Sequence, residues 1–413
     1  MTNPSTRVRI STTDSEHRVT ATELFFDLVF VYAITQVTAL LANTPTGLGL
    51  AEGMLLLALL WWCWCCFAWL GNTVRADRGV LRVVLITVMA LMLVIAIVLP
   101  ESFDDRSGGL NGAFVFVGCY ALVRLLHLFI YLLSDPANAE LRRVLGRTVL
   151  SLLPSLALLA IGAAMPTQSG RLAVWTTAFV ADAIGIYLTG SSGWQINSPA
   201  HWAERHGLIV IIALGESIVA IGIGVSGIPV SWPLIAAAVL GVVVTASLWW
   251  LYFDAVQTAA EHRLAALAGT ARTAQARDGY TYLHFPLIAG IVLTALGLKK
   301  IVEYVADPAH ELSDSLTGLP AWALTGGAGV YLVGSAAFAL RTTGHRSVLR
   351  LLVGLVLLIA LPVVEQLPAL VALGALAVVL AALAGYETQH RWAGDWATNH
   401  AERVDPPPAA SRH

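Results

Sequence analysis

The chain has 413 residues, of which 57% are apolar and only 12% are charged, against about 25% charged residues in typical soluble domains. Its formal net charge of −2 gives no indication of nucleic-acid binding, so no nucleic-acid partner is expected. The 13 Trp and 35 Gly are typical of a multi-pass membrane protein. We therefore expect an all-α polytopic fold whose main partner is the lipid bilayer.

Twelve apolar runs are long enough to cross a bilayer as helices. The first run follows a polar, basic segment and has no small-residue cleavage site after it, so we interpret it as a retained span and not as a signal peptide. The runs cover residues 22–42, 50–70, 80–99, 111–133, 145–165, 172–190, 204–225, 231–253, 279–298, 319–340, 347–365 and 367–385.

These runs divide the chain into four parts. A cytoplasmic N-terminal segment (1–21) precedes a first six-helix half (22–190) and a second six-helix half (191–385). The last part is a polar cytoplasmic tail (386–413) that we expect to be disordered.

A faint internal similarity relates the two halves. Leu-Trp-Trp ends the second run at 60–62 and the eighth run at 248–250, and Glu23 and Glu204 open the first and seventh runs. Six spans in the same order in each half would make a parallel repeat, a plan found among transporters. Chance similarity between apolar helices is the alternative explanation.

The basic residues indicate which side of the membrane each loop faces. With the N-terminus in the cytoplasm, 19 of the 24 Lys and Arg residues fall in inside segments and four in outside segments, while Arg124 lies within a span. This asymmetry is what the positive-inside rule requires. We therefore expect both termini to lie on the cytoplasmic side of a bacterial plasma membrane.

Polar residues within or at the ends of the spans are the candidate substrate- or proton-binding groups, because intramembrane polar residues usually mark functional sites. Most of them fall in the cytoplasmic half of the membrane, as the rise of each helix places them. Glu216 lies about 18 Å further out than Glu204 and has no cation near it in sequence, so it is expected to be protonated or paired across helices. The candidates are Glu23, Asp27, Gln36, Arg124, His127, Asp182, Glu204, Arg205, His206, Glu216 and His284.

Arg124 needs a buried acid as its partner, because an unpaired guanidinium inside a membrane is costly. We expect Asp27 to be this partner, since the first and fourth spans would both line the centre of the first half. Asp182 is the alternative. The pair would either be functional or only hold helices in register.

The histidines and cysteines give no firm chemical signature. His127 and His284 are also compatible with hydrogen-bonded core positions. His201 and His206 flank Glu204, but their spacing matches no zinc motif, so no metal site is predicted. The four cysteines all lie in apolar segments, which gives no disulfide framework. The sequence identifies no cofactor.

Three blocks of sequence resemble the bacterial low temperature requirement A family. The resemblance implies a multi-pass membrane protein named for growth in the cold, with no settled activity to transfer to this chain. It marks as site residues the polar positions Glu23, Asp27, Glu204, Arg205, His206, Glu216 and His284. The blocks are ELFFDLVFV at 23–31, ERHGLIVIIALGES at 204–217, and HFPLIAGI at 284–291 followed by GLKK at 297–300.

Secondary transport of a small solute is the function that these features favour. The two halves would rock about a midplane site, with Asp27 and Glu216 as the carboxylates that bind a proton or the substrate. A membrane-embedded enzyme acting on a lipophilic substrate is one alternative, with the acids and histidines as acid–base groups or metal ligands. A structural or sensory protein whose buried charges only fix helix register is another. The sequence indicates neither the solute nor the oligomeric state.

The topology can be tested with reporter fusions. Reporters placed at Arg143, at Arg272 and at the C-terminus should lie in the cytoplasm, and reporters at Ser107 and Thr317 should lie outside, because the basic residues favour this orientation. A C-terminal reporter found outside would show that one of the twelve spans is wrongly assigned.

Overall fold

The computed structural model describes residues 17–75, 79–135, 137–224, 229–254 and 256–404. Within these ranges the regular elements are helices, and eleven of them are long and apolar enough to cross a membrane. The all-α polytopic fold expected from the sequence is therefore confirmed. The long helices are α1 (Ala21–Asn43), α2 (Gly47–Thr73), α3 (Gly79–Val98), α4 (Gly112–Ser134), α5 (Ala139–Ala163), α6 (Gln168–Thr189), α7 (Pro199–Gly224), α8 (Trp232–Phe253), α11 (His284–Ala306), α12 (Gly318–Thr343) and α15 (Ala369–Val404).

Two regions differ from the expected spans. The run at 347–365 forms two shorter helices, α13 (Val348–Leu358) and α14 (Leu361–Val364). Pro362 explains the break, because its nitrogen cannot donate to the Leu358 carbonyl and its ring would clash there. At the C-terminus, α15 continues as helix to Val404, inside the segment assigned to the polar tail, and residues 405–413 lie outside the described ranges.

The described part of the segment between α8 and α11 is mostly helical. It contains α9 (Val256–Ala266), α10 (Gly269–Gln275) and a seven-residue π-helix, η2 (Ala276–Tyr282), which continues directly toward α11. A π-helix widens the helical turn and is often found at functional sites. Here it leaves the Thr281 carbonyl to accept a hydrogen bond from Trp61 Nε1 of α2 at 2.8 Å.

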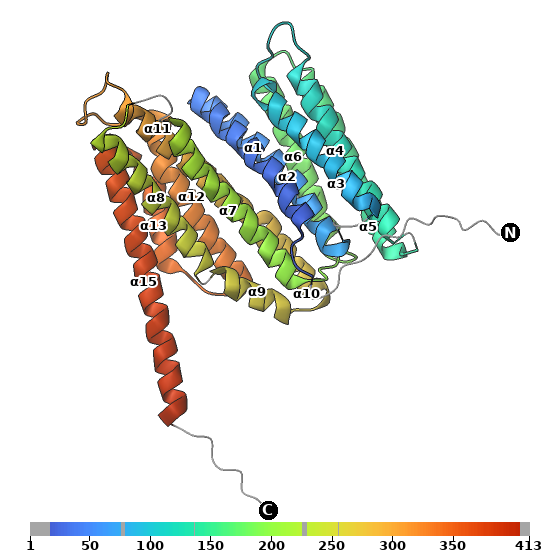
Figure 1. Ribbon diagram of the computed structural model, residues 1–413. Helices are drawn as coiled ribbons and strands as arrows, with labels where there is room; N and C mark the ends of the chain where they lie inside the picture. The colour runs from blue at the N-terminus through green and yellow to red at the C-terminus, as the bar shows by residue number, and fades with distance from the viewer. Residues whose placement is uncertain (1–16, 76–78, 136, 225–228, 255, 405–413) are drawn as a thin grey trace, which may run out of the picture.

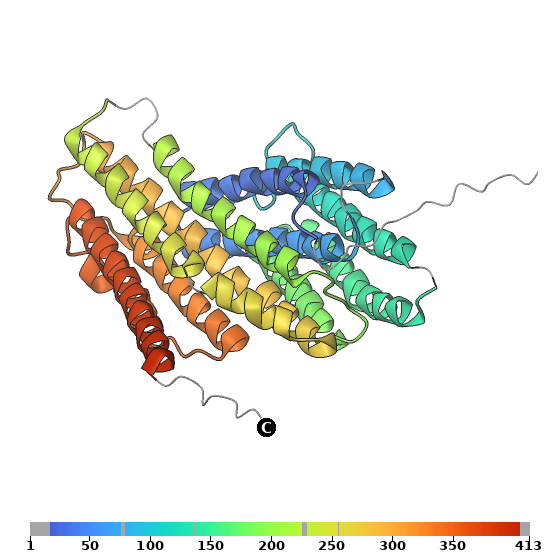
Figure 2. The ribbon, with the colours of Figure 1, turned by 60° about the horizontal axis from the view of Figure 1, so that its bottom comes forward.

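The long helices form two groups that meet along α1, α2 and α7. Helices α3 to α6 lie together on one side, and α8, α12, α13 and α15 lie together on the other (Figures 1 and 2). The contact between the groups runs from α1 and α2 to α7 and α11. The buried polar residues of α1 and α7, among them Glu23, Asp27 and Arg205, therefore lie between the groups.

The two halves share one order of helix contacts. In the first half α1 contacts α2 and α3, α3 contacts α4, α4 contacts α5, and α2 contacts α6. In the second half α7 contacts α8 and α11, α11 contacts α12, α12 contacts α13, and α8 contacts α15. With α13 and α14 counted as one element, these five contacts correspond, but the extensive α5–α6 contact of the first half has no comparable counterpart between α13 and α15. The five corresponding contacts support the proposal of a parallel repeat.

The outer helices present apolar side chains that imply contact with lipid. In α6 only 17% of the apolar window is buried within the protein. Val180, Ile184 and Leu188 of this helix are 44%, 53% and 76% exposed. Such a surface would be unfavourable in water and is favourable in a bilayer. The lipid bilayer is thus a partner of the protein.

Helices α11 and α12 pack with their backbones in contact, which glycine permits because it lacks a side chain. A Cβ atom at Gly290 would lie 2.5 Å from the Tyr331 nitrogen and 2.7 Å from the Gly327 carbonyl oxygen. A Cβ atom at Gly297 would lie 2.4 Å from the Leu324 Cα. Neither contact can be relieved without moving one helix.

We expect Gly290→Ala to destabilise the protein by about 1–3 kcal/mol, since overpacking a backbone contact forces the helices apart. Thermal unfolding of the purified protein would measure the loss. Gly118→Ala on α4 is the matched control, because a Cβ atom there has nothing within 4 Å. Equal stability of the two variants would contradict the close packing of α11 and α12.

Candidate functional site

A buried charge cluster joins α1 to α7, and it contains three of the residues predicted from the sequence. Arg205 of α7 donates through Nη1 to Glu23 Oε1 at 2.9 Å and through Nη2 to Asp27 Oδ1 at 2.8 Å. His201, one turn before Arg205, lies with Nε2 3.0 Å from Glu23 Oε1. All four side chains are at most 2% exposed. We call these four residues the interhelical cluster.

The contacts of this cluster fix how α1 and α7 run relative to each other. Glu23 is separated in sequence from its partners His201 and Arg205 by 178 and 182 positions, and Asp27 is separated from Arg205 by 178 positions. Further along, Thr35 Oγ1 donates to a Glu216 oxygen at a separation of 181. A nearly constant separation means that the helices run parallel and in register. This is the arrangement that the predicted parallel repeat requires.

Glu23 is held from its own helix as well as from α7. It occupies the third position of α1, where Thr20 caps the helix, and its Oε2 accepts from the Thr20 backbone nitrogen and from Thr20 Oγ1, each at 2.9 Å. This is a capping box. Both oxygens of Glu23 are therefore supplied with donors.

The tautomer of His201 follows from Asn72 of α2. Asn72 Oδ1 accepts from the backbone nitrogens of Asn197 and Ser198, so its Nδ2 is the group that faces His201 Nδ1, at 3.2 Å. Nδ1 must then accept a hydrogen bond, and the ring proton lies on Nε2. His201 is accordingly neutral and donates from Nε2 to Glu23.

The same geometry bears on metal binding. One ligand atom each from His17, Glu23 and His201 lie within 4.8 Å of one another. These are zinc-ligand types, and no signal in the sequence pointed to His17. However, His201 Nε2 carries a proton and has no lone pair for a metal, while Glu23 Oε1 already accepts from Arg205. The donor set fits a hydrogen-bonded cluster better than a metal centre.

Asp27 is less completely satisfied than Glu23. Its Oδ1 accepts from Arg205 and from Trp64 Nε1 of α2 at 2.9 Å. Its Oδ2 is buried and has no hydrogen-bond partner among the described residues. A buried polar atom without a partner is costly and is often explained by a function.

The expected partner of Arg124 was wrong. Arg124 Nη1 donates to Asp182 Oδ2 at 2.8 Å, whereas Asp27 is bound by Arg205. The sequence argument placed α1 at the centre of the first half, but α1 faces the second half. Asp182 also accepts from Trp62 Nε1 at 2.9 Å and from Ser151 Oγ at 3.1 Å.

His206 and His284, also predicted, meet beside the π-helix η2. Their ring centroids are 5.1 Å apart. His206 Nδ1 lies 2.9 Å from the Trp202 carbonyl oxygen, and His284 Nε2 lies 2.8 Å from the Tyr252 hydroxyl. Both rings are buried. They form a layer next to the interhelical cluster and are not part of it.

The remaining predicted residues lie apart from the cluster. Glu204 has a side chain that is 37% exposed, and it pairs loosely with Arg18 at 3.9 Å. Glu216 lies toward the other end of the α1–α7 contact, bound by Thr35. Gln36 is half-buried and makes no hydrogen bond to a described residue.

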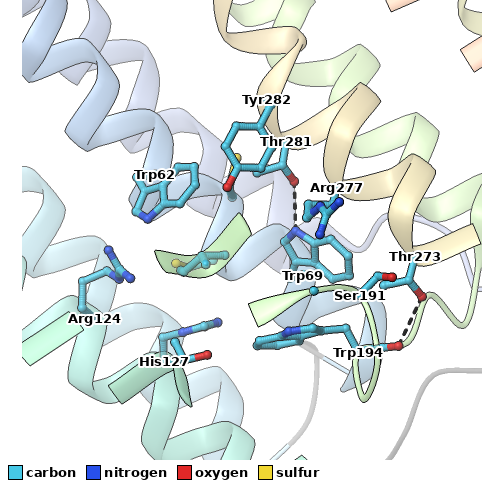
Figure 3. A pocket seen from close by; sticks show the side chains of 15 residues that line it. Trp62, Trp69, Arg124, His127, Ser191, Trp194, Thr273, Arg277, Thr281 and Tyr282 are labelled. Carbon is cyan, nitrogen blue, oxygen red and sulfur yellow. Dashed lines mark hydrogen bonds between the residues drawn. The ribbon is translucent and has the colours of Figure 1, made fainter. Parts of the chain in front are cut away.

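A pocket opens between the two halves, near Arg124 and His127. Its cavity volume is about 60 Å³, and the pocket opens to the surrounding solvent space. Figure 3 shows Trp62 and Tyr282 on one side of it and His127 and Trp194 on the other. The aromatic residues of this pocket were not among the predicted site residues. A cluster of tryptophans such as that in α2 is also typical of the interface between membrane and water.

The Arg124–Asp182 pair can be tested by rescue. Arg124→Leu should lower the thermal stability, because it leaves Asp182 buried without a cation, and such a loss typically costs about 3–5 kcal/mol. Adding Asp182→Asn should restore most of the stability. Adding Asp27→Asn is the control and should restore none of it. Rescue by Asp27→Asn alone would contradict the observed pairing.

Comparison with known proteins identifies the family. The family model described as bacterial low temperature requirement A protein matches residues 18–385. An uncharacterized protein of Rhizobium meliloti (strain 1021) is 31% identical over 291 residues, which cover 67% of this chain and 67% of that protein. No solved structure matches the chain significantly. This multi-pass membrane protein belongs to the bacterial low temperature requirement A family.

Proposed function

We propose that the protein is a proton-linked secondary transporter of a small solute, in which the two halves move against each other across the α1–α7 contact. The interhelical cluster carries the proposal. It lies between the halves and holds two carboxylates, Glu23 and Asp27, against the single guanidinium of Arg205. Carboxylates inside a membrane are costly and are retained mainly where they bind ions, protons or substrates.

One proton would balance the charge of the interhelical cluster. Glu23 accepts from donors on both oxygens, which suits an ionised carboxylate paired with Arg205. His201 is neutral because Asn72 donates to its Nδ1. That leaves Oδ2 of Asp27, the buried oxygen without a described partner, as the atom that would take up the proton.

Protonation of Asp27 would change the strength of the link between the halves. An ionised Asp27 attracts Arg205 strongly in a buried site of low dielectric constant, and a neutral Asp27 attracts it much less. Loading and release of a proton would therefore loosen and tighten this end of the α1–α7 contact. Rocking of two repeats about their interface is how many secondary transporters alternate access.

A second polar contact of the same two helices supports alternation. Thr35 donates to Glu216 at a level that lies eleven residues beyond Arg205 along α7, or about 16 Å. Contacts at two levels of one interface allow one level to open while the other stays closed. Glu216 would then be the carboxylate that faces the opposite side of the membrane.

The test is transport by purified protein in liposomes. Proteoliposomes that are alkaline inside are incubated with an acidic mixture of small metabolites, and the retained compounds are identified by mass spectrometry. The wild type should accumulate at least one solute beyond its outside concentration. Asp27→Asn should lose accumulation yet keep exchange of the same solute across the membrane, because Asn resembles the protonated acid and keeps an oxygen for Arg205 and Trp64.

The control is Glu303→Gln, the same kind of change at a carboxylate paired with Lys300 near the end of α11. This variant should accumulate solute as the wild type does. Accumulation that is insensitive to the gradient or to Asp27→Asn would contradict proton linkage. Absence of any accumulated solute would contradict transport itself.

A further inference from the structure

We infer that the pocket between the two halves binds a small aromatic carboxylate, and, resting on the transport function proposed above, that this is the chemical class of the solute. The pocket takes its walls from both halves. Trp62 and His127 belong to α2 and α4 of the first half, and Thr273, Arg277 and Tyr282 belong to α10 and η2 of the second. A ligand bound there would contact both halves, so any movement of one half against the other would change its contacts.

The walls of the pocket are aromatic and held in place. Trp62 and Tyr282 meet edge to face with ring centroids 5.6 Å apart, and Trp69 and Trp194 lie 5.9 Å apart. Trp69 Nε1 donates to Thr281 Oγ1 at 3.0 Å, and Trp62 Nε1 donates to Asp182. Rings fixed in this way offer flat surfaces to a flat ligand at little cost in entropy.

The end of the pocket at Arg124 and His127 contains buried nitrogen atoms without hydrogen-bond partners among the described residues. His127 is 4% exposed, and neither of its ring nitrogens makes a hydrogen bond to a described residue, although the Cys66 carbonyl lies close enough to interact with one of them. Arg124, 1% exposed, keeps Nε without a partner there. The Arg124 Nε–H is a donor that a carboxylate can accept from. A neutral His127 has a single N–H and adds a second donor only where that N–H does not go to the Cys66 carbonyl.

Arg277 lines the opposite end of the pocket from Arg124, and the charged residues around it, which do not line the pocket themselves, carry excess positive charge. Arg277 and Arg341 share one carboxylate, that of Asp278, at 2.8 and 2.7 Å. Arg272 gives its donors to backbone carbonyls. On the facing side Glu140 binds Ser192. Three guanidinium groups against two carboxylates favour the approach of an anion over that of a cation.

Calorimetric titration of the full chain in lipid nanodiscs tests the inference with four probes of similar size. Benzoate should bind saturably, and about tenfold or more tightly than benzyl alcohol or benzylamine, because those lack the carboxylate. Cyclohexanecarboxylate should also bind more weakly than benzoate, since it lacks the flat ring. Trp194→Leu and His127→Ala should each weaken benzoate binding by about tenfold.

Trp232→Leu is the matched control, because Trp232 is 83% exposed at the start of α8 and does not line the pocket. It should bind benzoate as the wild type does, and thermal unfolding of each variant checks that it is folded. Absence of saturable benzoate binding, equal binding of benzylamine, or unchanged binding in both pocket variants would overturn the inference. Intact benzoate binding without accumulation in proteoliposomes would instead count against transport alone.

Discussion

The pairing of Arg205 with Glu23 and Asp27 is the constraint on which the centre of the molecule depends. Three charges buried at a helix contact are tolerated only when each finds its partners, since an uncompensated charge there is far more costly than a lost apolar contact. The positions of these partners leave one register for α1 against α7. Asn72, His201 and the cap of α1 at Thr20 reinforce this register. These polar bonds join the two halves, and each half also has buried polar pairs of its own, such as Arg124–Asp182 in the first half.

The sequence predicted the features that depend on local composition. Apolar runs of sufficient length gave the long helices. The cost of charge in lipid selected Glu23, Asp27 and His206, and the family resemblance added Arg205; all four residues are buried. It did not predict which acid meets which base. Arg124 could reach either Asp27 or Asp182 by depth alone, and only the arrangement of helices decides between them. The depth of a residue in the membrane can be calculated from its position along one helix, but its partner depends on how the helices are packed together.

Other features were missed because their signals are weak or shared. Pro362 breaks the run at 347–365, and a proline near a helix end is also common in membrane helices that continue. The π-helix η2 follows an ordinary Ala-rich helix, and no residue pattern in it distinguishes it from an α-helix. Trp62, Trp69 and Trp194 line a pocket, yet tryptophans in a membrane protein are expected at the lipid headgroups. His201 had a signal, since it lies one turn before Arg205 on the same face.

The backbone contact between α11 and α12 has a mechanical consequence. Because no side chains separate the helices at Gly290 and Gly297, no rotamer changes can absorb a small displacement, and the pair must move as one stiff body. A displacement of η2 would therefore be transmitted through α11 to α12. The hydrogen bonds from Trp61 and Trp69 of α2 to Thr281 of η2 would be made or broken by such a displacement. Such close packing would favour discrete relative positions of the α11–α12 pair over gradual bending.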